Sequence, residues 1–330
     1  MMRRRLTTLV VPFALSALVL SACGGDDAET EPDNAAPASG GSEECPSDIS
    51  VGVLPLPDYA AVYWAQEKGQ FEEEGLNAEL VPLQGGPIGV QKVASGELEF
   101  SFSNAISTTV AVANDAPIVT VALTSSLGNG SQAVLVKPDS PIQGLADLDG
   151  KSLGTNTTGN VGDTAINNLI ADAGLDVEPS YVEVPFPEIA AGVESGSLDA
   201  GYLPEPFLSA AKKAGLRQVV DLTVGPNKQL PVATFVTSEQ YLGECRDNVA
   251  AFQRAVNDAS EEIVADEEEF RTFLSTISPI PPDVAKVVLL PSFETSISVE
   301  KLQRTADVLI DLGLVPAGYE AADAVFVADK

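Results

Sequence analysis

The chain has 330 residues, of which 45 % are hydrophobic, enough to form the cores of two modest domains. Its formal net charge of −30 disfavours binding to nucleic acid or to an anionic membrane surface. It contains no histidine, which excludes catalytic triads, general bases and metal sites that depend on this residue.

The first 22 residues have the pattern of a bacterial export signal. Arg3, Arg4 and Arg5 precede an apolar stretch, residues 9–20, which is too short to span a membrane as a helix. The stretch ends in Leu-Ser-Ala-Cys, which resembles the lipobox, where the signal is cleaved and the cysteine is lipidated. We therefore expect residues 1–22 to be removed and Cys23 to anchor the protein to the outer face of the bacterial cell membrane. An ordinary signal peptide cleaved nearby is the alternative.

Residues 23–44 are expected to form a flexible acidic tether, because residues 24–44 contain no large apolar side chain. The folded body then begins at residue 45. If Cys23 carries the lipid, Cys45 and Cys245 remain as an even pair in an oxidising compartment, and they are expected to form a disulfide. Two unpaired thiols are the alternative.

From residue 45 onward, predicted strands and helices alternate. Strands are predicted at residues 49–54, 76–83, 98–102, 118–123, 133–137, 152–155, 181–184, 198–202 and 232–237. Helices are predicted at 59–73, 85–95, 160–173, 188–195, 249–265 and 299–312, and others open near 104 and 205. This alternation indicates parallel βαβ units, whose ligand crevice lies at the carboxyl ends of the strands.

One stretch of sequence occurs twice. VASGELEFSFSNA at 93–105 matches VESGSLDAGYLPE at 193–205, with Gly96 opposite Gly196 and Glu99 opposite Asp199. In both copies a helix is predicted to end at the glycine, and a strand follows. The repeat predicts two similar α/β lobes with a ligand cleft between them, although chance similarity is the alternative. Breaks in the pattern place lobe 1 at 45–136 plus 232–330 and lobe 2 at 137–231.

Four segments then resemble a known family. YAAVYWAQEKGQFEEEGLNAEL (59–80), GGPIGVQKVASGELEFSFSN (85–104), IQGLADLDGKSLG (142–154) and EPFLSAAKKAG (205–215) occur in this order. Together they resemble the solute-binding proteins of ABC importers for nitrate, sulfonates, taurine and the pyrimidine precursor of thiamine. The resemblance implies a type II periplasmic-binding-protein fold, in which two crossover strands join two α/β lobes. It also implies a monomer without cofactor or metal that delivers a small solute to a membrane permease driven by a cytoplasmic ATPase.

The resemblance also implies a set of ligand-binding residues. They are Leu56, Asp58, Tyr59, Gly85, Gly86, Ser103, Asn104, Ser125, Thr155, Thr157, Thr158, Gly159 and Glu205. The hydroxyls and backbone amides of residues 155–162 are expected to hold an oxyanion, with an ordinary helix cap as the alternative. Glu205 is expected to accept a hydrogen bond from a ligand amine or ring N–H, with a first-turn helix glutamate as the alternative. Asp58 is a second candidate for the same role, or only a helix cap.

These loops contain neither arginine nor lysine, which favours a neutral or zwitterionic organic solute over a bare inorganic anion. A sulfonate or taurine-like solute is expected, and a thiamine pyrimidine precursor, nitrate or bicarbonate is the alternative. Two other functional classes fit the sequence less well. An enzyme like the fungal pyrimidine-precursor synthases is disfavoured, because these are implied to consume a histidine of their own. A surface adhesin would show low-complexity repeats or exposed apolar surface.

Overall fold

The structure is a computed structural model that describes residues 45–278 and 281–328. From residue 45 onward these residues form one compact unit. Among them, none of the helices combines the length and apolar character needed to cross a membrane. The predicted signal peptide, the lipidation of Cys23 and the tether at 23–44 all lie outside the described residues.

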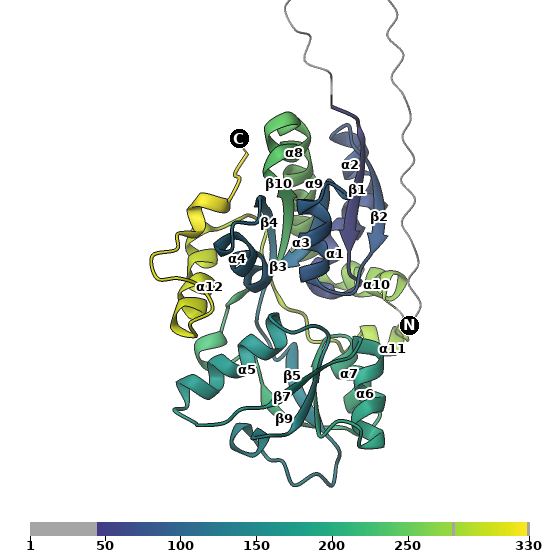
Figure 1. Ribbon diagram of the computed structural model, residues 1–330. Coiled ribbons are helices and arrows are strands. Elements are labelled where there is room, and N and C mark those ends of the chain that lie inside the picture. Colours follow the sequence, from purple (N-terminus) through teal and green to yellow (C-terminus); the bar gives the residue numbers. More distant parts are fainter. Residues whose placement is uncertain (1–44, 279–280, 329–330) are drawn as a thin grey trace, which may run out of the picture. The chain divides into compact units, whose positions relative to one another are not determined.

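The order of strands and helices follows the predicted alternation closely (Figure 1). The strands are β1 (Asp48–Val53), β2 (Asn77–Pro82), β3 (Phe100–Asn104), β4 (Ile118–Ser126), β5 (Gln132–Val136), β6 (Ser152–Thr155), β7 (Ser180–Glu183), β8 (Ala200–Pro204), β9 (Arg217–Asp221), β10 (Pro231–Ser238) and β11 (Ser292–Phe293). The α-helices are α1 (Ala60–Lys68), α2 (Gln70–Glu73), α3 (Gly86–Ala94), α4 (Ala105–Ala113), α5 (Val161–Asp172), α6 (Phe186–Ser195), α7 (Phe207–Lys213), α8 (Glu239–Glu244), α9 (Arg246–Ala265), α10 (Glu267–Ile277), α11 (Pro282–Ala285) and α12 (Val299–Asp311). Short 3-10 helices are η1 (Pro57–Tyr59), η2 (Leu145–Leu148), η3 (Gly225–Asn227) and η4 (Ala321–Ala324).

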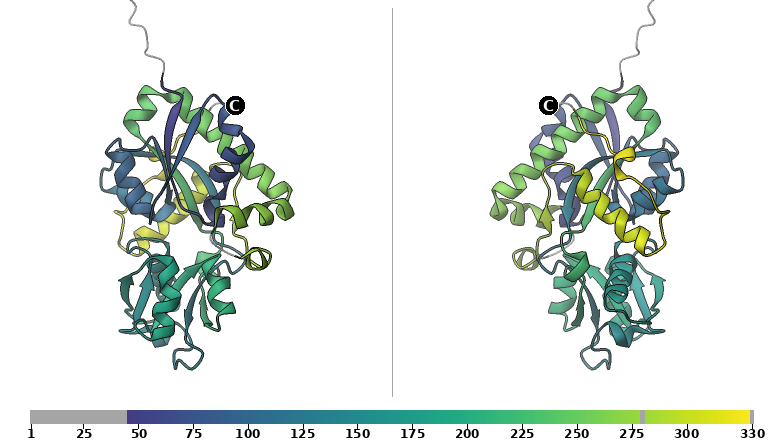
Figure 2. Two further views of the ribbon diagram at one scale, coloured as in Figure 1. Left: turned by 90° about the vertical axis from the view of Figure 1, so that its right-hand side faces the viewer. Right: turned by 90° about the vertical axis from the view of Figure 1, so that its left-hand side faces the viewer.

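The strands form two separate sheets with helices packed around each (Figure 2). The six-strand lobe has the strand order β11-β4-β10-β3-β1-β2, and the five-strand lobe has the order β7-β6-β8-β5-β9. Strands β1, β2 and β3 are parallel, as are β6, β7 and β8. Strand β10 runs antiparallel to β3, and β5 runs antiparallel to β8. Each of these two antiparallel strands is the first that the chain forms after it passes from one lobe to the other.

The two chain passages lie against each other. The Leu127 N–H donates to the carbonyl oxygen of Leu230 at 2.8 Å, and the Gln229 N–H donates to the carbonyl oxygen of Leu127 at 3.0 Å. The first passage occurs earlier than expected. Residues 132–136 were predicted to belong to lobe 1, whereas β5 pairs with β8 and β9 of the five-strand lobe. A run of buried apolar residues identifies a strand but not the sheet that it joins. We propose that the lobe boundaries lie at these two passages.

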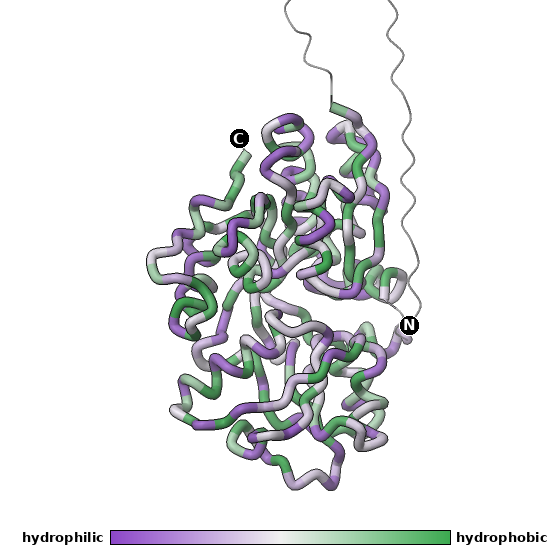
Figure 3. Tube along the Cα trace, viewed as in Figure 1, coloured by the Kyte–Doolittle hydropathy of each residue, from purple (hydrophilic) through white to green (hydrophobic). Residues whose placement is uncertain are grey.

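Aromatic side chains fill the core of the six-strand lobe, and the hydropathy along the chain shows apolar segments on the inner strands (Figure 3). Phe100 of β3 stacks on Phe252 of α9 with ring centroids 4.0 Å apart. Phe235 of β10 packs edge-on against the same ring at 5.8 Å. Helix α9 therefore covers this sheet from one side, because its apolar stripe meets a continuous aromatic surface.

The predicted repeat corresponds to equivalent structure in the two lobes. Gly96 and Gly196 follow α3 and α6 with φ angles of 74° and 79°, in the left-handed region that glycine adopts readily. Glu99 accepts hydrogen bonds from the backbone N–H and hydroxyl of Ser50 at 2.7 and 2.5 Å. Asp199 accepts the same pair from Ser152, both at 2.9 Å. Each lobe thus fastens the amino-terminal ends of two neighbouring parallel strands with one carboxylate.

The predicted disulfide is confirmed. Cys45, just before β1, is bonded to Cys245 at the start of α9, and the bond spans 200 residues of sequence. It joins the first described residue to the helix that covers the aromatic core of the six-strand lobe.

Candidate functional site

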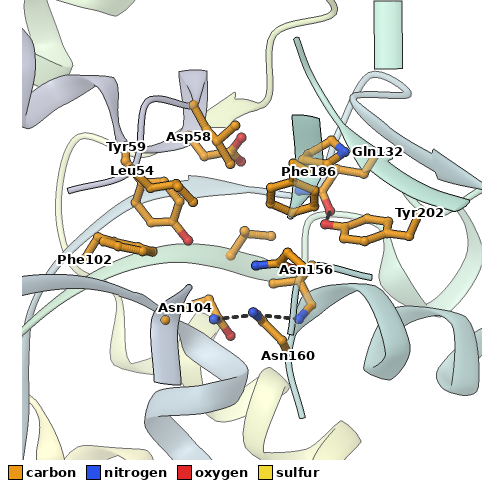
Figure 4. Close-up of a pocket in the computed structure, with 15 residues that line it drawn as sticks. Leu54, Asp58, Tyr59, Phe102, Asn104, Gln132, Asn156, Asn160, Phe186 and Tyr202 are labelled. Carbon is orange, nitrogen blue, oxygen red and sulfur yellow. Dashed lines mark hydrogen bonds between the residues drawn. The ribbon is translucent and has the colours of Figure 1, made fainter. Parts of the chain in front are cut away.

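A cavity lies between the two lobes, where the carboxyl ends of the parallel strands meet (Figure 4). It is lined by Leu54, Leu56, Asp58, Tyr59, Gly86, Phe102, Asn104, Gln132, Asn156, Asn160, Val161, Phe186, Tyr202, Pro204 and Val232. These residues come from strand ends, helix starts and connecting loops of both lobes. The cavity volume is about 30 Å³, room for about two water molecules, so a larger solute requires side chains or lobes to move apart.

Asp58 is the one aspartate, glutamate, lysine or arginine among the lining residues, and it is only 3 % exposed. It lies in η1, the short turn that follows β1. The Ser125 hydroxyl donates to its carboxylate at 2.8 Å, and the Thr124 hydroxyl donates to its backbone carbonyl at 2.7 Å. Burial raises the pKa of the Asp58 carboxyl from 3.8 to about 6, while the Ser125 hydrogen bond partly opposes that rise. A solute with N–H donors can add further hydrogen bonds to this buried carboxylate.

Aromatic side chains flank the cavity on both lobes (Figure 4). On the six-strand lobe, Tyr59 packs edge-on against Phe102 with ring centroids 4.9 Å apart. On the five-strand lobe, Phe186 packs edge-on against Tyr202 at 5.8 Å. The Tyr202 hydroxyl donates to the side-chain oxygen of Gln132 at 2.7 Å, which fixes the orientation of both groups. Burial raises the pKa of Tyr59 and Tyr202 well above the usual tyrosine range, so both hydroxyls stay protonated. Flat apolar rings opposite each other suit a planar organic solute.

Two asparagines meet at one side of the cavity. Asn104 caps α4, accepting the Ser107 N–H at 2.9 Å, and Asn160 caps α5, accepting the Val161 N–H at 2.7 Å. The Asn104 amide then donates to the Asn160 side-chain oxygen at 2.7 Å, across the two lobes (Figure 4). Gly86 allows this arrangement, because a Cβ at that position would lie 2.6 Å from the Asn104 amide nitrogen.

The backbone amides at the start of α5, predicted to bind an oxyanion, already have acceptors within the protein. The Thr158 N–H donates to Glu183 at 2.8 Å. The N–H groups of Gly159 and Asn160 donate to the two carboxylate oxygens of Asp163, at 2.6 and 2.9 Å. Acidic side chains therefore occupy the positions that a bound anion would take. The hydrogen bonds at this loop are those of an ordinary helix cap, which was the alternative to an oxyanion site.

The structure brings only some of the predicted ligand residues to the cavity. Leu56, Asp58, Tyr59, Gly86 and Asn104 line it. Gly85, Ser103, Ser125, Thr155, Thr157, Thr158, Gly159 and Glu205 do not. Several of these support a lining residue instead, and their direct contact with a solute remains a prediction.

Two of these supporting residues show how they act. Ser125 donates to the carboxylate of Asp58, and Thr157 accepts a hydrogen bond of 2.5 Å from the Asn160 amide. Both therefore orient a side chain of the cavity rather than forming part of its surface.

Glu205, the preferred candidate acid, lies just beyond the lining residue Pro204 and is 1 % exposed. Its carboxylate accepts the Ser209 hydroxyl at 2.7 Å, the Ser209 N–H at 3.1 Å and the Leu289 N–H at 3.1 Å. Burial raises its pKa, and these hydrogen bonds lower it. The carboxylate joins the start of α7 to the segment between α11 and β11.

Several lining residues were missed. Tyr202 and Pro204 end the repeated strand of the second lobe, which the repeat places at the edge of the cleft, although neither is among the predicted ligand-binding residues. Gln132 begins the antiparallel strand β5, whose sheet was assigned wrongly. Phe186 begins α6, two residues before the predicted start of that helix. Within the described residues, no cluster of three or more acidic or cysteine side chains could hold a metal ion.

Curated proteins with similar sequences include binding proteins. A Brucella abortus (strain 2308) protein, named as a binding protein, is 26 % identical over 226 residues, covering 65 % of this chain and 66 % of that relative, just under two thirds of its length. The formylaminopyrimidine-binding protein of Halalkalibacterium halodurans is 26 % identical over 267 residues, covering 78 % of this chain and 77 % of that protein.

Solved structures share the fold. The alkanesulfonate-binding protein SsuA from Xanthomonas axonopodis pv. citri, bound to MOPS, superposes with a TM-score of 0.72 at 20 % identity, covering 86 % of this chain and 99 % of that one. The predicted two-lobed binding-protein fold is therefore confirmed. Residues 56–270, more than half of the chain, match the family described as NMT1/THI5 like. This chain belongs to the NMT1/THI5-like family.

Proposed function

We propose that this protein is the extracytoplasmic solute-binding component of an ABC importer, and that it captures a planar, amine-bearing heteroaromatic solute between its lobes. The observation that carries the proposal is the buried carboxylate of Asp58 in a cavity flanked by Tyr59, Phe102, Phe186 and Tyr202. The carboxylate accepts hydrogen bonds from amino and ring N–H groups, and the aromatic side chains contact the faces of a ring.

Charge is the reason to prefer this solute over the sulfonate or taurine-like solute expected from the sequence. An anion next to Asp58 would be repelled above pH 6, where the carboxylate is ionised. Neither arginine nor lysine lines the cavity, and the amides at the start of α5 are occupied by acidic side chains. The name of the Halalkalibacterium halodurans relative, a formylaminopyrimidine-binding protein, supports the same solute class.

The partners and location belong to the same proposal. A solute-binding protein needs a membrane permease and its ATPase to move the solute onward, and the lipid on Cys23 would hold the protein beside them. We propose no chemical conversion of the solute, because capture and release are sufficient for this role.

Isothermal titration calorimetry on the mature protein tests the proposal. Formylaminopyrimidine is expected to bind, and taurine, a short alkylsulfonate, nitrate and bicarbonate are expected to give no binding heat. Asp58→Asn should weaken binding by about 10-fold to 100-fold, because a charge-assisted hydrogen bond in a buried site is lost.

Glu205→Gln is the matched control, because Glu205 is equally buried but lies outside the cavity. It should bind formylaminopyrimidine within a few-fold of wild type. The opposite result is that taurine or the alkylsulfonate binds to wild type and binds equally well or better to Asp58→Asn. That result would contradict the proposed solute class and favour the sulfonate or taurine-like solute expected from the sequence.

A further inference from the structure

Two hydrogen bonds link the first turns of α4 and α5 across the cleft. One is the bond from Asn104 to Asn160, described above. The other runs from the Ser107 hydroxyl to the carbonyl oxygen of Gly159, at 3.1 Å. Ser107 also accepts a bond of 3.1 Å from the Asn104 amide, so its hydroxyl connects the two links. Ser107 is 6 % exposed and does not line the cavity.

Each lobe prepares its half of this contact by itself. Asn104 is oriented by the Ser107 N–H within the six-strand lobe. Asn160 is oriented by Thr157 and by the Val161 N–H within the five-strand lobe. The donors and acceptors are therefore fixed before the lobes meet, and little side-chain freedom is lost when they join.

Beside these two hydrogen bonds, residues of the loops before α3 and α5 also approach each other across the cleft. The Asn156 amide donates to the carbonyl oxygen of Gln84 at 3.4 Å. A Cβ added to Gly85 would lie 2.9 Å from Thr157. The loop before α3 thus approaches the loop before α5 without intervening side-chain bulk.

We propose that Ser107, with Asn104 and Asn160, forms a latch that holds the two lobes closed and so sets the retention time of the solute. Ser107 does not contact the solute in this proposal, so it is a positioning residue. Because the apparent dissociation constant is the intrinsic constant divided by the closed fraction, a weaker latch lowers affinity while the cavity surface is unchanged. The effect on solute rests on the proposed function, whereas the effect on closure does not.

Ser107→Ala tests the latch. It removes the link to Gly159 but retains the backbone N–H that Asn104 caps. In small-angle X-ray scattering of the protein without solute, the variant should have a larger radius of gyration than wild type. With formylaminopyrimidine, it should release the solute about fivefold faster with little change in association rate, as expected for loss of one hydrogen bond.

Ser260→Ala is the matched control, because the Ser260 hydroxyl is also buried and donates to a helix carbonyl, that of Val256, inside α9. It should leave both measurements at wild-type values. Equal radii of gyration for Ser107→Ala and wild type would overturn the latch, whatever the solute. If formylaminopyrimidine fails to bind either protein while the radii differ, the proposed solute is wrong and the latch stands.

Discussion

Replacing Asp58 by asparagine should stabilise the protein without solute at neutral pH. The pKa of this carboxyl is raised by burial from 3.8 to about 6. Between these two values the native state binds more protons than the unfolded state, so the free energy of unfolding falls as pH rises through this window. A rise of this size corresponds to roughly 3 kcal/mol, which is lost once the pH exceeds 6. Asparagine keeps an oxygen to accept the Ser125 hydroxyl and carries no charge.

Chemical denaturation of wild type and Asp58→Asn across pH 4 to 7.5 measures this effect. The two proteins should have similar stability at pH 4, and the variant should gain about 3 kcal/mol, or roughly 6 °C in Tm, at pH 7.5. Asp163, another buried carboxyl with a raised pKa, is present in both proteins, so its own contribution is common to both.

Asp199→Asn provides a control of opposite sign. Hydrogen bonds from Ser152 lower the pKa of Asp199, so its contribution to stability is present above the unfolded pKa and is lost as pH falls. A stability difference between wild type and Asp58→Asn that stays constant from pH 4 to 7.5 would refute the reasoning. So would an asparagine variant that is less stable than wild type at pH 7.5.

Three further changes have definite expected outcomes. Replacing Cys45 and Cys245 together by serine should cost up to about 5 kcal/mol in denaturant titrations, because the bond closes a loop of 200 residues; an unchanged midpoint would contradict this. Gly162→Ala should weaken solute binding measured by calorimetry, since its Cβ would lie 2.4 Å from the ring of Tyr202; unchanged affinity would show that the ring yields freely. Glu205→Ala should lower the melting temperature without solute by leaving buried donors unpaired, and an unaltered melt would argue against this structural role.

Local sequence pattern was sufficient for nine of the eleven strands that the structure describes and for the repeated units, but it did not predict β9 or β11. The glycines after α3 and α6 and the acids that follow them have short-range causes, namely a left-handed helix end and a strand start. The same pattern placed Asp58 and Asn104 at strand ends, where the cavity lies.

The local sequence pattern could not predict hydrogen-bond partners that are distant in the sequence. Glu205 is 84 residues from Leu289, and no local periodicity identifies that contact. The acceptors of the α5 amides were also missed, although Asp163 is only three residues after Asn160. An acid at that spacing forms a capping box, and this signal should have disfavoured an anion site.

Hydrogen bonds from Ser50 to Glu99 and from Ser152 to Asp199 hold together the strand ends that lie remote from the cavity in the two lobes. The lining residues Leu54, Asn104, Asn156 and Pro204 lie at the opposite ends of those strands. The hydrogen bonds that hold neighbouring strands together and the residues that line the cavity thus lie at opposite ends of the same strands. Substitutions in the loops at the cavity can therefore change what the cavity contacts without disturbing the carboxylate–serine hydrogen bonds at the other ends of the strands.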